Sequence, residues 1–175
     1  MVLTLPPTFP ELGKYRRYNW NLSSFAIYTL VETSKESLHD IAFQLQGDWW
    51  GEEGNGGHSL VRVAPDFDYQ GRSLRDVIQA HISLLERDTQ HVRSYAEFND
   101  GDVDWFPTAF GVVTSKADMQ ERSPLFVYAD PYDEPTRCPL DKFHFRVGDG
   151  RSMLSSIRLG DTVCPDAKEM YAIST

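Results

Sequence analysis

A glycine-rich loop with two adjacent tryptophans is the stretch of this chain that is hardest to explain as scaffold. Residues 47–58 read GDWWGEEGNGGH and contain Trp49 and Trp50, two of the four tryptophans. Glycine loses the most conformational freedom on ordering, so this loop is a poor helix or strand. An indole on such a loop packs on the core or on a bound partner. We therefore predict that Trp49 and Trp50 bind a ligand. His58 closes the loop and is either a general acid or base or a solvent-facing residue.

Acidic residues surround a third tryptophan in the sequence NDGDVDW, residues 99–105. A carboxyl group that loses water beside an indole has a raised pKa and can act as a general acid. We therefore take Asp102 and Asp104 as candidate catalytic groups and Trp105 as a ligand-binding residue. The plainer alternative is a loop carboxylate beside a core tryptophan. A calcium-binding EF-hand is excluded, because a loop starting at Asp100 has Trp105 at its sixth position, where glycine is required.

Two further groups combine polar and aromatic side chains. Asp66 and Tyr69 follow an expected strand, and ligands of parallel sheets bind beyond the carboxyl ends of strands. His144 and Arg146 are two residues apart in another expected strand, so they project from one face. An imidazole beside a guanidinium could bind a carboxylate or enolate, or could be the polar face of a strand. All four residues are predicted to bind a ligand.

Motifs of several enzyme classes are missing from the sequence. There is no phosphate-binding glycine loop, no dinucleotide fingerprint and no nucleophile elbow. His39 and Asp40 are neighbours on an expected helix, where consecutive side chains point about 100° apart, so we do not expect a shared metal ion. Cys138 and Cys164 lack the two further ligands that zinc needs. We therefore expect no metal and no cofactor.

Composition limits the partners of this chain. It has 175 residues and a mass of 20.0 kDa, with 26 acidic and 17 basic residues and a net charge of −9. Such a charge disfavours nucleic acid and anionic membrane surfaces. No apolar run approaches the roughly 20 residues of a membrane helix, and the N-terminus does not resemble a secretory signal. We expect a cytoplasmic protein, and its oligomeric state is left open.

The first half of the chain reads as alternating strands and helices. Residues 24–32 are β-branched and aromatic, as in a buried strand. A helix begins at Thr33, which forms a capping-box pattern with Glu36, and ends at Gly47. A short strand follows at 60–63, then a turn-rich connection at 64–72. Ser73 and Asp76 form a second capping-box pattern at the start of a helix that runs to about Asp88. This order predicts a βαβα unit with parallel strands.

The second half reads as strands joined by polar segments. Strand-like runs separated by turn signals occur at 91–98, 108–114, 124–129 and 143–147. The segment 115–123 reads as a polar connection, and 152–159 as a strand or short helix. We predict an α/β or α+β fold in one domain spanning 1–175, with antiparallel strands added to the βαβα unit in a mixed sheet. Residues 1–22 are expected to form an irregular arm packed on that domain.

Three short runs in the second half carry a resemblance to a known family. They read PLFVYAD at 124–130, YDEP at 132–135 and FRV at 145–147. These runs, with the order of strands and helices before them, resemble the C-terminal portion of a family of small bacterial domains of unknown function. Because that family has no established activity, the resemblance implies an order of elements and no chemistry.

Two functions remain open from the sequence. The first is a cofactor-free protein or enzyme for an apolar or aromatic small molecule, with proton transfer of the cyclase, isomerase or dehydratase type. The second is an acidic interaction module, of immunity or inhibitor type, for a basic protein partner. Tryptophans in a concave pocket favour the first function, because ligand pockets have apolar walls with a few polar groups. Tryptophans on an open acidic face favour the second, because tryptophan is common at interface hot spots.

Overall fold

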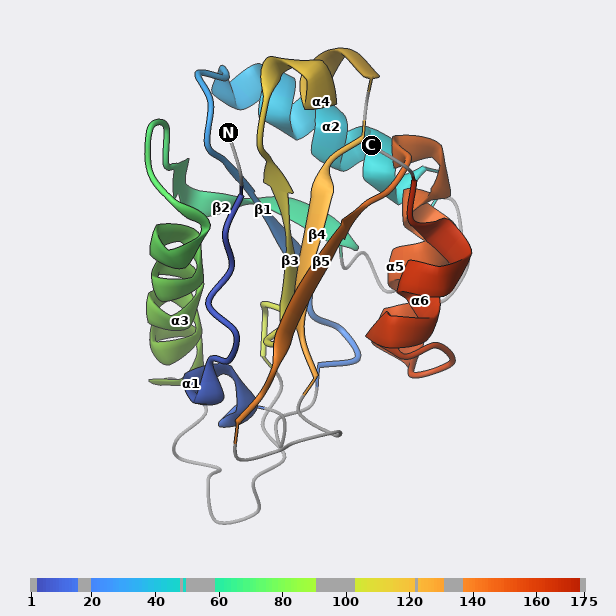
Figure 1. The fold of residues 1–175 in the computed structure, drawn as a ribbon. Helices are drawn as coiled ribbons and strands as arrows, with labels where there is room; N and C mark the ends of the chain where they lie inside the picture. The colour runs from blue at the N-terminus through green and yellow to red at the C-terminus, as the bar shows by residue number, and fades with distance from the viewer. Residues whose placement is uncertain are drawn as a thin grey trace.

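The fold is built on one mixed sheet (Figure 1). The computed structural model describes residues 3–15, 20–47, 49, 59–90, 103–121, 123–130 and 137–173. Within these residues five strands pair in the order β2-β1-β3-β4-β5. In chain order they are β1 (Phe25–Thr29), β2 (Val61–Asp68), β3 (Ala109–Val113), β4 (Leu125–Ala129) and β5 (Leu140–His144). β1 is parallel to β2 and β3, while β4 is antiparallel to β3 and β5. The predicted mixed sheet is confirmed.

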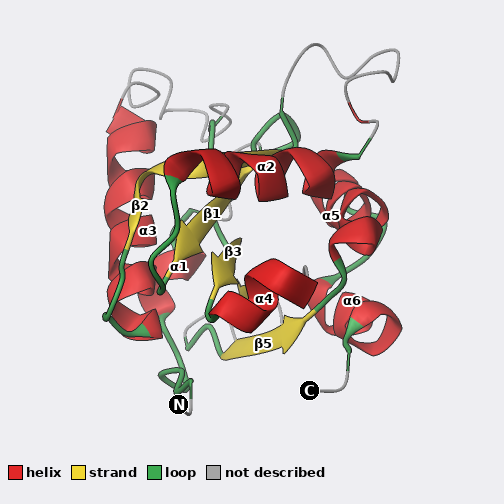
Figure 2. Ribbon diagram, turned by 90° about the horizontal axis from the view of Figure 1, so that it is seen from above, coloured by secondary structure: helices red, strands yellow, loops and turns green. Residues whose placement is uncertain are grey.

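Helices cover both faces of the sheet, as Figure 2 shows from above. One face carries α2 (Lys35–Gln46), α5 (Gly150–Leu159) and α6 (Cys164–Tyr171). The other carries α3 (Leu74–Gln90) and α1 (Pro10–Gly13). Alternate residues of β1 enter the two layers, so that Phe25 and Ile27 belong to an α2–α5 core and Ala26 and Tyr28 to an α3 core. Burial on both faces explains the continuous apolar runs of β1 and β4.

The two capping-box predictions had different outcomes. In α3 both reciprocal bonds are present, because the Ser73 amide donates to Asp76 Oδ2 at 3.0 Å and the Asp76 amide donates to Ser73 Oγ at 3.3 Å. In α2 the cap is Ser34, whose hydroxyl accepts from the Ser37 amide at 3.1 Å. The predicted cap Thr33 was wrong by one residue, since its hydroxyl instead donates to the Val31 carbonyl at 3.1 Å.

Strand β2 is longer than the sequence predicted and continues to Asp68 through part of the expected connection at 64–72. The sequence did not indicate this extension because it contains Pro65, and proline cannot donate a ladder hydrogen bond. β2 lies at the edge of the sheet, where proline is tolerated. The pairing also shifts there, from Ile27 with Val63 to Thr29 with Asp68.

The elements at the C-terminal end required two corrections. The strand expected at 143–147 is β5 at 140–144, which begins with the polar residues Asp141 and Lys142 because it is an edge strand with partly exposed side chains. The segment 152–159, left open as strand or helix, lies in helix α5, which ends at Gly160 in the left-handed conformation with φ 81°. A short helix, α4 (Lys116–Glu121), occupies part of the expected connection at 115–123. The strand expected at 91–98 lies outside the described residues.

The N-terminal segment lies along the α3 face of the sheet (Figure 1). Phe9, Leu12 and Tyr15 are buried in the α3 core. The Leu140 amide donates to the Pro7 carbonyl at 3.1 Å, so this segment also contacts β5. No helix in the described ranges is long and apolar enough to cross a membrane.

Candidate functional site

The tryptophans predicted to share a site lie on opposite faces of the sheet. Trp49 is 6% exposed in the α2–α5 core, with the Arg158 guanidinium 4.8 Å from its ring centroid. Trp105 is 7% exposed in the α3 core, with Arg62 at 4.2 Å from its ring. The sheet separates the two indoles, so they cannot line one pocket. The remaining predicted residues of these two loops, Trp50, His58 and Asp102, lie outside the described residues.

Of the other residues predicted for the site, two aspartates are exposed and a tyrosine packs against another tyrosine. Asp104 is exposed, and its backbone carbonyl accepts from the Ser24 amide at 2.8 Å. Asp66 forms an exposed ion pair with Arg87 of α3 at 3.5 Å. Tyr69 packs edge-on against Tyr28, with ring centroids 6.1 Å apart. Asp66 and Tyr69 therefore both lie on the α3 side of the sheet.

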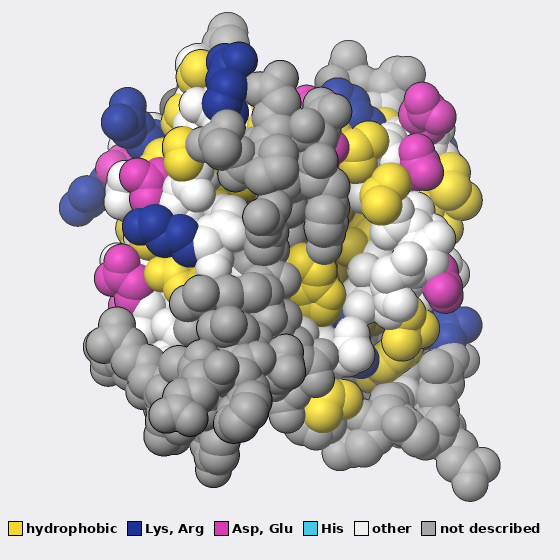
Figure 3. Space-filling model, turned by 90° about the horizontal axis from the view of Figure 1, so that it is seen from below, with side chains coloured by type: hydrophobic (Ala, Val, Ile, Leu, Met, Phe, Trp, Pro, Cys, Tyr) yellow, Lys and Arg dark blue, Asp and Glu magenta, His cyan; other side chains and the backbone are white. Residues whose placement is uncertain are grey.

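An apolar pocket opens at the lower end of the sheet in Figure 1, beyond the last residue of β4. Its volume is about 320 Å³. The apolar walls come from segments far apart in the chain, namely Trp20, Phe106, Ile157 and Val163. Figure 3 looks at this end of the molecule and shows hydrophobic side chains gathered in a hollow. We call this feature the Trp20 pocket.

Stacked rings make the aromatic wall of the Trp20 pocket continuous with the core. Trp20 stacks on Phe106 with centroids 5.0 Å apart and planes inclined by 24°. Phe106 stacks in turn on Phe25 of β1 at 4.4 Å. Such offset stacks hold aromatic rings in place. The pocket therefore presents a flat apolar surface of fixed position.

Two polar groups of the Trp20 pocket are suited to contact a ligand. Thr108 is only 5% exposed and lines the pocket, so its hydroxyl is available on the pocket wall. Asp130 follows β4 directly, and its amide is fixed by the Pro139 carbonyl at 3.0 Å.

Cys164 also lines the Trp20 pocket, at the start of α6. Burial, and to a lesser extent the nearby charge of Asp130, raises the pKa of its thiol to about 12. The thiolate is the nucleophilic form, so a thiol with this pKa is almost fully protonated near neutrality. Cys164 is thus part of an apolar wall and is unsuited to nucleophilic catalysis.

We expect alkylation of Cys164 to be at least tenfold slower at pH 8 than alkylation of a free thiol, because so little thiolate is present. The rate should rise steeply as the pH approaches 12, up to the pH at which the chain unfolds. Mass spectrometry of the peptides that contain each cysteine, after timed exposure to iodoacetamide, measures this rate. Cys138 is fully buried and serves as the internal reference. Rapid labelling of Cys164 at pH 7 would contradict the raised pKa.

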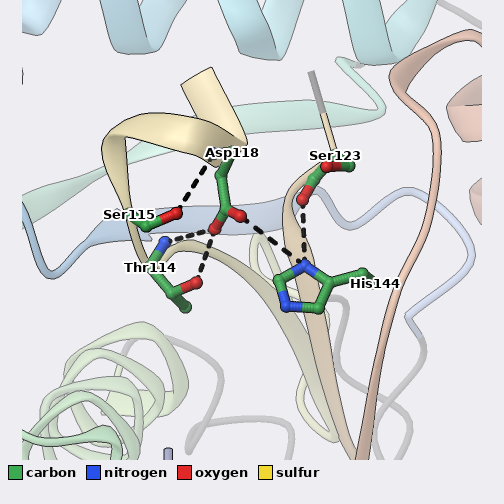
Figure 4. Close-up of polar contacts among 5 residues, drawn as sticks. All are labelled: Thr114, Ser115, Asp118, Ser123 and His144. Atoms are coloured by element: carbon green, nitrogen blue, oxygen red, sulfur yellow. Dashed lines mark hydrogen bonds and ion pairs between the residues drawn. The ribbon is translucent and has the colours of Figure 1, made fainter. Parts of the chain in front are cut away.

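A polar network at the opposite end of the sheet holds one of the predicted residues (Figure 4). The His144 Nδ1–H donates to the Ser123 carbonyl at 3.0 Å and lies 3.8 Å from Asp118 Oδ1. Asp118 Oδ2 accepts from the Thr114 amide at 2.7 Å and from the Thr114 hydroxyl at 2.5 Å. The network ties α4 to β3 and β5. Asp118 was not predicted, although Ser115 and Asp118 have the spacing of a helix cap, and the Asp118 amide does donate to Ser115 Oγ at 3.2 Å.

His144 and Arg146 have different surroundings, despite their spacing of two residues. The imidazole Nδ1 is used by Ser123 and Asp118, whereas Arg146 is exposed on the wall of a wide cleft of about 620 Å³ with Gln44 and Glu121. The contacts of the imidazole are thus those of a structural residue. We therefore do not combine the two residues in one carboxylate-binding site.

The comparisons with known proteins assign no function to the candidate site. No family model, no curated protein and no solved structure matches this chain. Within the described ranges, no group of three or more His, Cys, Asp or Glu side chains could hold a metal ion. The Trp20 pocket is the candidate functional site because it combines a volume of about 320 Å³, an aromatic wall and two polar lining residues, Thr108 and Asp130.

Proposed function

We propose that this protein binds a small apolar or aromatic molecule in the Trp20 pocket. The observation that carries the proposal is a pocket of about 320 Å³ whose wall is the stack of Trp20 on Phe106. Ligand pockets are typically about 300–1,000 Å³ with mainly apolar and aromatic linings and a few polar groups. A flat ring would lie against this stack, and a polar substituent would meet the hydroxyl of Thr108.

The size of the pocket sets the expected affinity. A ligand with about twelve non-hydrogen atoms, at about 0.5 kcal/mol for each atom, gains about 6 kcal/mol. This free energy corresponds to a dissociation constant of about 40 µM. Binding in this range is measurable by calorimetry at ordinary protein concentrations.

The alternative function, an acidic interaction module for a basic protein, receives less support. It needs aromatic side chains on an open surface, whereas Trp49 and Trp105 are buried in the two cores. Of the candidate groups for proton transfer, Asp104 is exposed and is not a lining residue, whereas His58 and Asp102 lie outside the described residues. We therefore propose ligand binding as the primary function, and proton-transfer chemistry remains a prediction from the sequence.

The proposal predicts that 2-naphthalenemethanol, a neutral bicyclic alcohol, binds this chain with a dissociation constant of tens of micromolar. In Val163→Trp the new indole would occupy the mouth of the pocket, and binding should weaken at least tenfold. Val163 is 51% exposed, so the larger side chain should not disturb the core. Calorimetric titration of both proteins measures the effect.

The matched control is Met170→Trp, which adds the same side chain at a residue of α6 that is 65% exposed and does not line the pocket. This variant should bind the alcohol as the unmodified chain does. Equal affinities for all three proteins would place any binding elsewhere, and the absence of binding to the unmodified chain would overturn the proposal.

A further inference from the structure

The described lining residues of the Trp20 pocket carry formal charge of one sign. Among the described lining residues Asp130 is the only one with a formal charge, and no lysine or arginine is among them. The other lining groups are apolar side chains, glycine, a thiol and the hydroxyls of Thr108 and Thr162. In the described part of the pocket wall, the formal charge is therefore that of one carboxylate.

The negative charge of Asp130 acts on a group of the pocket wall. Asp130 contributes to the raised pKa of the Cys164 thiol on the pocket wall, after the larger effect of burial. Lys168, the one lysine of α6, forms an ion pair with Asp141 at 2.8 Å. Asp130 has an interaction of its own, but a carboxylate offers about four lone-pair sites and can accept hydrogen bonds from a ligand as well.

The net charge of the whole chain also favours a cationic ligand. The chain has a net charge of −9, so its long-range field attracts cations and repels anions. A ligand carboxylate in the pocket would lie near Asp130 with no described cationic side chain on the walls to compensate. A ligand ammonium would gain a charged hydrogen bond, and such bonds are stronger than neutral ones.

We propose that the natural ligand of the Trp20 pocket is an aromatic amine in its protonated form, with its ring on the Trp20–Phe106 stack and its ammonium directed to Asp130. This inference rests on the proposed function and adds the chemical class of the ligand. The aromatic part supplies most of the binding free energy, and the ammonium supplies the selectivity.

Three probes that share a naphthalene ring test the inference on the full chain. They are 2-naphthylmethylamine, which is a cation at pH 7, the neutral 2-naphthalenemethanol, and the anion 2-naphthoate. We expect the amine to bind about fivefold tighter than the alcohol, and the carboxylate at least tenfold weaker than the alcohol. In Asp130→Asn the amine and the alcohol should bind within twofold of each other, because the preference for the ammonium is lost.

Asp161→Asn is the matched control, because it removes one negative charge from the loop after α5 at a residue that does not line the pocket. It should keep the fivefold preference for the amine. A preference that survives in Asp130→Asn, or equal binding of amine and alcohol to the unmodified chain, would overturn the inference and leave the pocket intact as a binding site. If none of the three probes binds, the proposed function and the inference both fail.

Discussion

Lowering the pH from 7 to 4 should remove about 3 kcal/mol of stability through His81 alone. Burial lowers the pKa of this imidazole from 6.5 to about 4, and hydrogen bonds to backbone groups at Phe106 and Pro107 only partly offset the effect. The unfolded chain takes up the proton below pH 6.5, whereas the folded chain does so only near pH 4. The free energy of unfolding therefore falls as the pH drops through this window, by about 1.36 kcal/mol for each unit of pKa difference.

The contacts of His81 explain why it stays neutral. It is 0% exposed in the α3 core. Its Nε2 lies 2.9 Å from the Phe106 carbonyl, which can only accept, so Nε2 carries the hydrogen. Nδ1 is then an acceptor for the Tyr28 hydroxyl at 2.9 Å. A second proton on the ring would remove the acceptor and leave a charge in an apolar core.

Urea unfolding of the unmodified chain and of His81→Gln at pH 7, 6, 5 and 4 measures this contribution. Glutamine keeps a donor and an acceptor but does not titrate, so the variant still loses stability through the carboxylates that both proteins share. The stability difference between the two proteins should shrink by about 2 kcal/mol at pH 5 and about 3 kcal/mol at pH 4. A difference that does not change with pH would contradict the neutral buried imidazole.

Replacing Gly150 by alanine should destabilise the fold by about 2 kcal/mol, although alanine is the better helix former. Gly150 is the first residue of α5 and packs directly on α2. A Cβ at this position would lie 2.7 Å from Leu45 Cδ2 and 2.8 Å from the Leu45 carbonyl oxygen. The side-chain atom can move, but the carbonyl oxygen belongs to the backbone of α2, so the two helices must separate.

Gly148→Ala is the matched control for this substitution. A Cβ at Gly148 would meet no atom within 4 Å. The control should change stability by no more than about 0.5 kcal/mol, as is usual for a surface substitution without contacts. The urea concentrations at the unfolding midpoints of the two variants measure the difference in stability. Similar midpoints would mean that α2 and α5 are not in close contact. Ile157 of α5 lines the Trp20 pocket, so Gly150→Ala should weaken ligand binding as well.

Local patterns were enough to predict much of the fold. The βαβα order, the mixed sheet and the cap of α3 follow from hydrophobic period and from pairs of residues close in the chain, such as Ser73 and Asp76. The bounds of two strands were predicted wrongly because each strand lies at an edge of the sheet. Pro65 in β2 and Asp141 with Lys142 in β5 both lie in edge strands, where proline and polar residues are accepted.

The candidate site could not be predicted in the same way. Trp49 and Trp105 are conspicuous in the sequence, but the sheet places them in separate cores. The Trp20 pocket brings together residues 20, 106 and 157, and no pattern in the sequence links them. Thr108 likewise lines the pocket only because of the way the chain folds. Tertiary packing, and no local motif, creates this site.

A crystal structure of the chain grown with 2-naphthalenemethanol tests most directly whether an aromatic ligand binds in the Trp20 pocket. We expect the naphthalene ring to lie against Trp20 and Phe106, with the hydroxyl of the alcohol within hydrogen-bonding distance of Thr108 Oγ1. A complex in which the alcohol is bound elsewhere, while the side chains of the Trp20 pocket close on one another, would contradict it.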